Sequence, residues 1–170
     1  MTVSEGSTFP QGVKFNYVPY TPEDSDVLAC GVPISMDLDK EIAGKKVVLV
    51  AVPGAFTPTC TANHIPPFLE KINELKSKGV DEVIVLSAND PFVMSAWGKA
   101  LHGADKVKFV SDPNSQFAKA NGLDLDLTDK GMGVRVKRFA VIVDKGKVTY
   151  IGVDPQGVEK SGVDAVVAKL

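Results

Sequence analysis

The sequence lacks the features of a membrane-spanning or nucleic-acid-binding protein. Its hydrophobic runs are too short to cross a bilayer, and its charges are not gathered into blocks of one sign. The 19 basic and 21 acidic residues give a formal net charge of −2, so we expect no nucleic acid and no membrane as partner. The amino-terminal residues show neither the charged nor the apolar segment of a secretory signal. The 170 residues are expected to form one domain, residues 1–170.

Cysteine and histidine are also scarce, with two of each in the chain. In a chain without a secretory signal, two cysteines are more typical of reduced thiols with redox or catalytic roles than of a disulfide scaffold. Cys30, Cys60, His64 and His102 show none of the close paired spacing of a zinc site. We therefore predict no metal and no cofactor, and we interpret His64 as a hydrogen-bonded structural residue.

The most informative stretch of the chain leads to Cys60. Residues 47–52 form an apolar, β-branched run that predicts a buried strand, which ends at Pro53-Gly54. Thr57-Pro58 then predicts a helix start, with threonine as the N-cap and proline at the first helical position. Cys60 is thus the third helical residue, where the helix dipole and free amide N–H groups favour the reactive thiolate. We expect Cys60 to carry the chemistry of the protein.

The rest of the chain alternates between predicted strands and helices. The helix after Cys60 is expected to kink at Pro66-Pro67 and to stop at Lys78-Gly79. Short connections and right-handed crossovers favour an α/β fold with a central mixed β-sheet and helices on both faces. A reactive cysteine that follows a central strand and opens a helix is the layout of the thioredoxin-like fold. The further predicted elements are strands at residues 13–18, 34–38, 83–87 and 107–110, helices at 90–101 and 115–120, a hairpin at 138–143 and 147–151, and a terminal helix from about residue 161.

One motif and several shorter segments carry a family resemblance. Pro53-x-x-x-Thr57-x-x-Cys60 matches Pro-x-x-x-Thr/Ser-x-x-Cys, the active-site motif of the peroxiredoxins. From about residue 15 to residue 150, the chain resembles the short subfamily that includes peroxiredoxin five and the fungal alkyl hydroperoxide reductases. The segments that extend the resemblance are residues 60–66 (Cys-Thr-Ala-Asn-His-Ile-Pro), 87–90 (Ser-Ala-Asn-Asp), 111–113 (Ser-Asp-Pro) and 137–139 (Lys-Arg-Phe).

The resemblance implies a thiol peroxidase, active in antioxidant defence, whose attacking residue is Cys60. In the family this cysteine attacks the O–O bond of a hydroperoxide and becomes a sulfenic acid. The alignment gives Arg138 as the active-site arginine, whose guanidinium stabilises the thiolate and the charge that develops on peroxide oxygen. Arg135 lies three residues earlier, so strand alternation predicts that it faces the opposite side. A solvated charge at a strand edge is the alternative for either arginine.

Two further residues of the motif are expected to shape the site around the sulfur. As N-cap, Thr57 is expected to accept the Cys60 backbone N–H, which leaves its hydroxyl proton for the thiolate or the peroxide. A plain N-cap is the alternative interpretation. The resemblance implies that Pro53 shields the thiolate from water, although a role in the turn alone explains a proline at this position equally well.

Cys30 is the second thiol and lies beside Gly31 in a stretch predicted to be a loop. The resemblance implies that it resolves the sulfenic acid of Cys60 through a disulfide between the subunits of a homodimer. Family members that resolve within one chain use a cysteine near the carboxyl terminus, where this chain has Ser161. The resemblance further implies that thioredoxin, or glutaredoxin with glutathione, reduces the disulfide. The alternative is that Cys30 is a bystander and an external thiol resolves Cys60.

The sequence leaves the biological role and the location open. The same residues would serve a redox sensor or holdase, which is oxidised at Cys60 and passes a disulfide to a client without turnover. Thioredoxin-type disulfide exchange is not favoured, because it needs Cys-x-x-Cys and Asn63 stands in place of the second cysteine. Ala168-Lys169-Leu170 resembles the Ser-Lys-Leu peroxisomal signal and predicts a peroxisomal protein if the tail is free. The alternative is that these residues close a terminal helix of a cytoplasmic protein.

Overall fold

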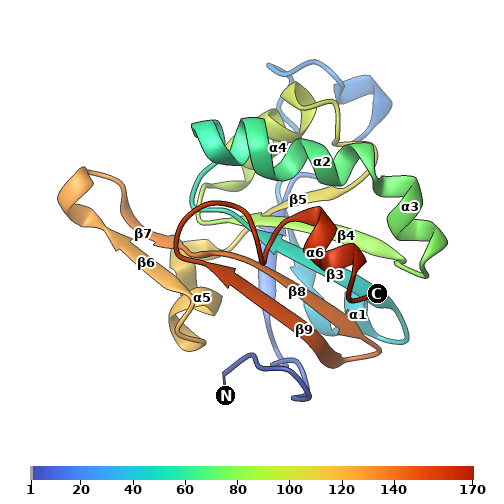
Figure 1. Cartoon of the computed structure of the whole chain (residues 1–170). Coiled ribbons are helices and arrows are strands. Elements are labelled where there is room, and N and C mark those ends of the chain that lie inside the picture. The colour runs from blue at the N-terminus through green and yellow to red at the C-terminus, as the bar shows by residue number, and fades with distance from the viewer. Residues whose placement is uncertain (1) are drawn as a thin grey trace.

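A seven-stranded mixed β-sheet forms the centre of the structure, a computed structural model that describes residues 2–170 (Figure 1). In spatial order its strands are β2 (Ile34–Asp37), β1 (Lys14–Tyr17), β5 (Lys108–Ser111), β4 (Glu82–Ser87), β3 (Lys46–Ala51), β8 (Arg138–Asp144) and β9 (Lys147–Asp154). The inner strands β3, β4 and β5 are parallel, whereas β8 runs antiparallel to β3. At one edge of the sheet β1 runs antiparallel to both β5 and β2, and at the other edge β9 runs antiparallel to β8. The predicted mixed sheet is therefore confirmed.

The alternation of side chains along β3 divides the hydrophobic core into two layers. Val48 and Val50 pack on one face of the sheet, and Val47, Leu49 and Ala51 pack on the other. All five side chains are buried. A strand that is covered on both faces is apolar at every position, which explains the continuous hydrophobic run in the sequence.

Helices cover both faces of the sheet, as predicted (Figure 1). The core layer of Val48 and Val50 is covered by α2 (Ile65–Glu70), α3 (Ile72–Ser77), α4 (Pro91–Ala100) and α6 (Val163–Val167). The opposite layer is covered by α1 (Leu38–Ile42) and α5 (Gln116–Ala120). Within residues 2–170, no helix combines the length and the apolar character that a membrane crossing requires.

The helical segment that follows β3 is broken in a different way from the prediction. Cys60–His64 forms a π-helical turn, in which hydrogen bonds span one residue more than in an α-helix. Pro66 and Pro67 then lie in the first turn of α2, where a residue has no N–H partner within the α-helix, so their missing N–H groups cost α2 no hydrogen bond. The break falls instead between α2 and α3, at Lys71, where the backbone has φ −95° and ψ 15°.

A small second sheet was not among the predicted elements. β6 (Asp124–Leu127) and β7 (Gly133–Val136) pair antiparallel and form a hairpin that projects from one side of the molecule, coloured orange in Figure 1. Only Lys137 separates β7 from β8, yet the two strands belong to different sheets. The alternation of side chains along β8 therefore does not extend back to residue 135.

Candidate active site

Cys60 lies beyond the carboxyl end of the central strand β3, in the first turn of the next helical segment. The segment begins at Pro58, so Cys60 is its third residue, as predicted. The side chain is only 1% exposed and belongs to the core layer beneath α2 and α4. The sulfur is thus shielded from water at a helix start, where backbone N–H groups and the helix dipole favour an anion.

Arg138, the first residue of β8, contacts this sulfur directly. Its Nη2 donates a hydrogen bond to Cys60 Sγ at 3.3 Å. The next residue, Phe139, pairs with Ala51 at the end of β3, so Arg138 reaches the sulfur from the neighbouring strand. A guanidinium keeps its proton throughout the physiological pH range and therefore offers the sulfur a permanent positive charge.

His64 holds the other side of the guanidinium. Its Nδ1 lies 2.9 Å from Arg138 Nη1, and its Nε2 lies 2.9 Å from the carbonyl oxygen of Ser161. Burial lowers the pKa of His64 to about 4, and the nearby guanidinium acts in the same direction, whereas the Ser161 carbonyl and Asp154 oppose the shift. The expected hydrogen-bonded histidine is present. Its contact with Arg138 was not predicted, because the sequence shows only that it follows Cys60 by four residues.

The Thr57 hydroxyl is placed differently from the prediction. It donates a hydrogen bond to the Gly54 carbonyl at 2.7 Å, and the Thr57 backbone carbonyl accepts the Thr61 N–H at 3.0 Å. The expected cap bond to the Cys60 amide and the free hydroxyl proton are therefore wrong. The hydroxyl instead closes the loop over residues 54–57. A Cβ at position 54 would lie 2.9 Å from Cγ2 of Thr57, so glycine lets the Thr57 side chain approach the loop backbone this closely.

Pro53 begins this loop, and a second arginine reaches it. Arg135 Nη1 lies 3.5 Å from the Pro53 carbonyl oxygen, and its Nε donates to the Met132 carbonyl at 2.7 Å. The prediction that Arg135 faces away is wrong, because β7 belongs to the projecting hairpin and not to the sheet of β8. Asn89 ties the loop to the end of β4, since its Oδ1 accepts the Ala55 N–H at 2.9 Å.

Comparison with known proteins places this geometry in a family. The family model described as Redoxin matches residues 4–167. A protein of Lipomyces kononenkoae named "Putative peroxisomal peroxiredoxin" is 60% identical over 163 residues, which cover 95% of this chain and 98% of that protein. The chain belongs to the peroxiredoxins.

Solved structures agree with this assignment. Reduced Prx3 in complex with H₂O₂ from Vibrio vulnificus is 38% identical, with a TM-score of 0.85 over 98% of each chain. Peroxiredoxin 5 from Alvinella pompejana is 27% identical, with a TM-score of 0.79 over 98% of this chain and 97% of that chain. The predicted thioredoxin-like fold and the predicted class of enzyme, a thiol peroxidase of the peroxiredoxin type, are therefore confirmed.

The second cysteine of this peroxiredoxin lies at the surface. Cys30 is exposed, in the loop before β2, and both it and the buried Cys60 are free thiols. The loop rests on α4, where the buried Lys99 ammonium donates to the Ala29 carbonyl at 2.8 Å. The structure thus joins Cys60 to Arg138, places Pro53 and Thr57 in the loop that precedes Cys60, and places Cys30 in a different, exposed loop.

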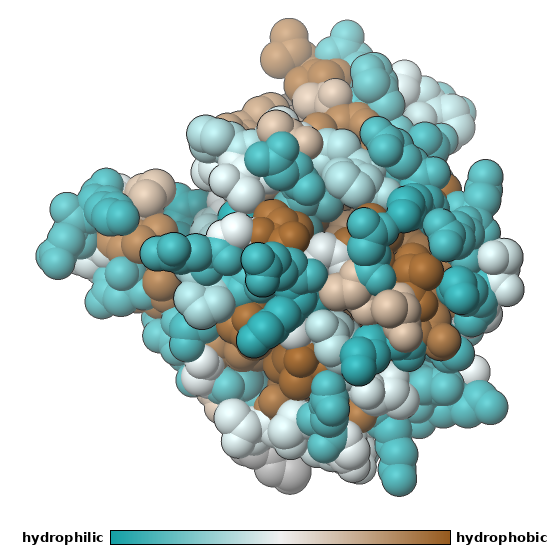
Figure 2. Space-filling model, in the orientation of Figure 1, coloured by the Kyte–Doolittle hydropathy of each residue, from teal (hydrophilic) through white to brown (hydrophobic). Residues whose placement is uncertain are grey.

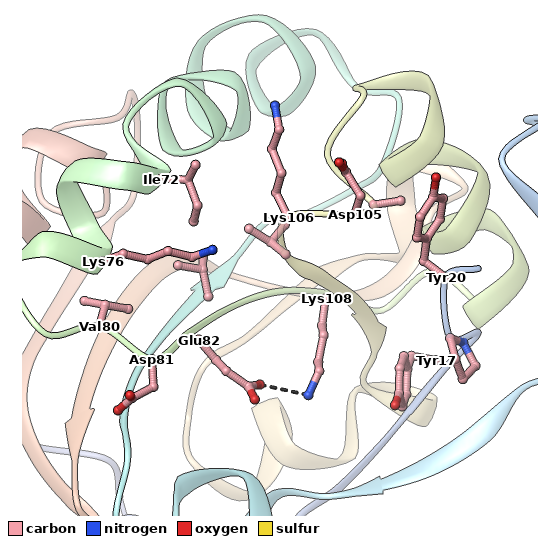
Figure 3. Close-up of a pocket in the computed structure, with 14 residues that line it drawn as sticks. Tyr17, Tyr20, Ile72, Lys76, Val80, Asp81, Glu82, Asp105, Lys106 and Lys108 are labelled. Carbon is pink, nitrogen blue, oxygen red and sulfur yellow. Dashed lines mark hydrogen bonds and ion pairs between the residues drawn. The ribbon is translucent and has the colours of Figure 1, made fainter. Parts of the chain in front are cut away.

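A groove of about 430 Å³ lies apart from the peroxiredoxin site (Figure 3). Glu82 and Lys108, the first residues of β4 and β5, line it and form an ion pair at 2.8 Å. Tyr17 and Tyr20 line another side. Because β3, β4 and β5 are parallel, the groove lies at the amino ends of the strands, whereas Cys60 follows a carboxyl end.

Proposed function

We propose that the protein reduces hydrogen peroxide and alkyl hydroperoxides with Cys60 as the attacking thiolate. The observation that carries the proposal is the 3.3 Å hydrogen bond from Arg138 to Cys60 Sγ at a helix start. In the proposed step the thiolate attacks one peroxide oxygen, the O–O bond breaks, and the sulfur keeps that oxygen as a sulfenic acid. The other oxygen leaves as alkoxide or hydroxide and is protonated to the alcohol or water. Arg138 stabilises the negative charge as it moves from sulfur to oxygen.

Pro53 and Thr57 are proposed to enclose the reacting atoms. The loop that they begin and end is fixed by the Thr57–Gly54 hydrogen bond and by the bond between Asn89 and Ala55. A fixed loop over a buried sulfur keeps water from solvating the thiolate, which leaves the sulfur more nucleophilic. In this proposal Thr57 acts by holding the loop, and its hydroxyl proton is engaged by a backbone carbonyl.

Cys30 of a second copy is proposed to resolve the sulfenic acid, which gives an intersubunit disulfide and releases water. Cys30 is exposed, so a second copy can reach it, whereas Cys60 is buried. The Cys30 loop also exposes the apolar side chains of Leu28 (87%) and Val32 (78%), which a second copy would cover. Brown side chains stand out at the top of Figure 2, where Figure 1 places this loop. Thioredoxin, or glutaredoxin with glutathione, is proposed to reduce the disulfide.

Peroxide consumption tests the proposed chemistry. Stopped-flow measurements with hydrogen peroxide and tert-butyl hydroperoxide should show rapid consumption by the wild type and none above background by Cys60→Ser. Cys30→Ser is the matched control, because it keeps the attacking thiol and is expected to complete the first turnover only. Equal rates for the wild type and Cys60→Ser would refute the proposal.

Disulfide mapping tests the proposed resolution. Non-reducing electrophoresis after one equivalent of peroxide should show a cross-linked dimer that Cys30→Ser does not form. A ladder that contains monomers alone would contradict the intersubunit bridge. Oxidation that occurs once and is not reversed by thioredoxin or glutaredoxin with glutathione would favour the alternative role, a redox sensor or holdase.

A peroxisomal location is also proposed, supported by Ala168-Lys169-Leu170 and by the name of the Lipomyces relative. The tail is packed, since Leu170 contacts the core layer and Lys169 Nζ lies 5.8 Å from the centre of the Tyr150 ring. A targeting receptor would therefore have to detach the last residues from the protein. An amino-terminal fluorescent fusion should reach peroxisomes and should stay in the cytoplasm when the last three residues are deleted. A distribution that the deletion does not change would overturn this proposal.

A further inference from the structure

The active-site arginine lies beside a carboxylate with which it forms no ion pair. Asp154 of β9 stands directly opposite Arg138 in the register of the two strands. Its carboxylate instead accepts hydrogen bonds from the backbone N–H groups of Glu159, Lys160 and Ser161 and from the Ser161 hydroxyl, at 2.7–3.0 Å. Among residues 2–170, no ion pair involves Arg138. The loop after β9 thus engages this carboxylate, and the guanidinium has no ion-pair partner among the described residues.

The side chain that accepts a hydrogen bond from Nη1 of the guanidinium is an imidazole, His64, and not a carboxylate. The Ser161 carbonyl can only accept a hydrogen bond, and the Arg138 guanidinium can only donate one. Both bonds therefore require a neutral imidazole with its proton on Nε2. Burial holds the pKa of His64 at about 4, so the ring is neutral at physiological pH.

The surroundings of His64 also fix the orientation of its ring. Phe68 packs against it edge to face, with ring centres 5.9 Å apart, and Ser161 is held by the carboxylate of Asp154. The guanidinium is planar and rigid, so holding Nη1 at His64 determines the direction of Nη2, which bonds to Cys60.

We propose that His64 is a positioning residue for the peroxidase reaction, a neutral acceptor that aims Arg138 at Cys60 and leaves the charge of the arginine unpaired. A carboxylate at the same place would also aim the guanidinium, but its negative charge would cancel much of the field that Arg138 exerts on the sulfur and the peroxide. The inference rests on the proposed function, in which Cys60 attacks as the thiolate.

Three substitutions of His64 separate positioning from simple packing. His64→Phe fills the space of the ring but offers no acceptor. His64→Asn offers an uncharged oxygen close to the place of Nδ1, and His64→Asp offers a charged oxygen in the same shape. A packing role makes His64→Phe the mildest change. The proposed role makes His64→Asn the mildest, because it alone keeps an uncharged acceptor. His102→Asn, at the exposed second histidine, is the matched control.

The measurements are the fraction of Cys60 ionised as a function of pH, read from thiolate absorbance, and the rate constant with hydrogen peroxide. His64→Phe should lower the rate by about tenfold or more, as expected for the loss of a hydrogen bond to a charged group. His64→Asp keeps the hydrogen bond but should also lower the rate, because its negative charge opposes the field of Arg138. The rate constant of His64→Asn should lie between those of these variants and the wild type. His102→Asn should have the rate constant and the ionisation curve of the wild type. A folded His64→Phe variant with the wild-type ionisation curve and rate would overturn the proposal.

Two observations keep this test independent of the proposed function and of the folding of the variants. The ionisation curve and the rate of alkylation by iodoacetamide need no peroxide. Measured in a Cys30→Ser background, where Cys60 is the one remaining cysteine, they report on Arg138 and Cys60 even if the wild type reduces no hydroperoxide. Nitrogen NMR of the wild type, with His102→Asn to assign the signals, should show His64 neutral and protonated at Nε2. A ring protonated at Nδ1 or at both nitrogens near neutral pH would overturn the inference.

Discussion

Acidification should lower the free energy of unfolding through His64. The pKa of this residue is lowered from 6.5 to about 4 in the folded protein, first because the ring is buried. Between these two values the unfolded chain takes up a proton that the folded protein does not, so stability falls as the pH falls through this window. A shift of this size corresponds to about 3 kcal/mol, most of which should be lost by about pH 4.5.

The charged groups that face His64 are Arg138, which acts against protonation, and Asp154, which favours it. Other titrating groups are common to the wild type and to a His64 variant. The pKa of Glu82 lies below its ordinary value, so its protonation lowers the free energy of unfolding only at lower pH. Burial raises the pKa of Asp112, so protonation of this group raises the free energy of unfolding as the pH falls. The difference in pH-dependent loss of stability between the wild type and His64→Phe therefore reports the contribution of His64 alone.

Urea denaturation at about pH 7.5 and at about pH 4.5 measures the effect. The wild type and the control variant His102→Asn should lose about 2 to 3 kcal/mol more than His64→Phe over this interval. If His64→Phe loses as much stability as the wild type, the neutral buried histidine is not the cause and the reasoning fails.

Three further substitutions test other contacts. Arg138→Gln removes the positive charge from Cys60 and should lower the rate with hydrogen peroxide by about 100-fold in stopped flow; an unchanged rate would separate this arginine from the chemistry. Asp90→Ala removes the side chain that caps α4 and should lower the free energy of unfolding by about 1 kcal/mol in urea denaturation. A loss below a few tenths of a kcal/mol would mean that water caps the helix equally well. Gly152→Ala would drive a Cβ into the Lys160 carbonyl and should lower stability by about 1 to 3 kcal/mol; a neutral effect on the melting temperature would show that the loop after β9 can shift.

The parts of the fold that the sequence predicted are those with a strong local pattern. The apolar, β-branched runs inside β3 and β4 predicted buried strands correctly, because a strand covered on both faces is apolar along its centre. The hairpin of β6 and β7 was missed, although Asp124-Leu125-Asp126-Leu127 alternates as a half-buried strand does. Apart from the buried Val136, its side chains are partly buried or exposed, so it lacks the continuous hydrophobic run that marked the central strands.

The candidate site was predictable only where its residues are neighbours in sequence. Cys60 could be placed at a helix start because Thr57-Pro58 marks that start locally. The contact between His64 and Arg138 joins residues 74 positions apart, and no periodicity reports such a contact. Arg135 was misplaced because strand alternation was carried across Lys137, where the chain passes from one sheet to another.

The π-helical turn at Cys60–His64 separates the sulfur-bearing segment from the α-helix that follows it. Unwinding it breaks the bond from the Thr61 N–H to the Thr57 carbonyl and the bond from the Ile65 N–H to the Cys60 carbonyl. Beyond that point the prolines at positions 66 and 67 have no N–H to lose. The sulfur-bearing turn is therefore joined to α2 by fewer backbone hydrogen bonds than a continuous α-helix would supply.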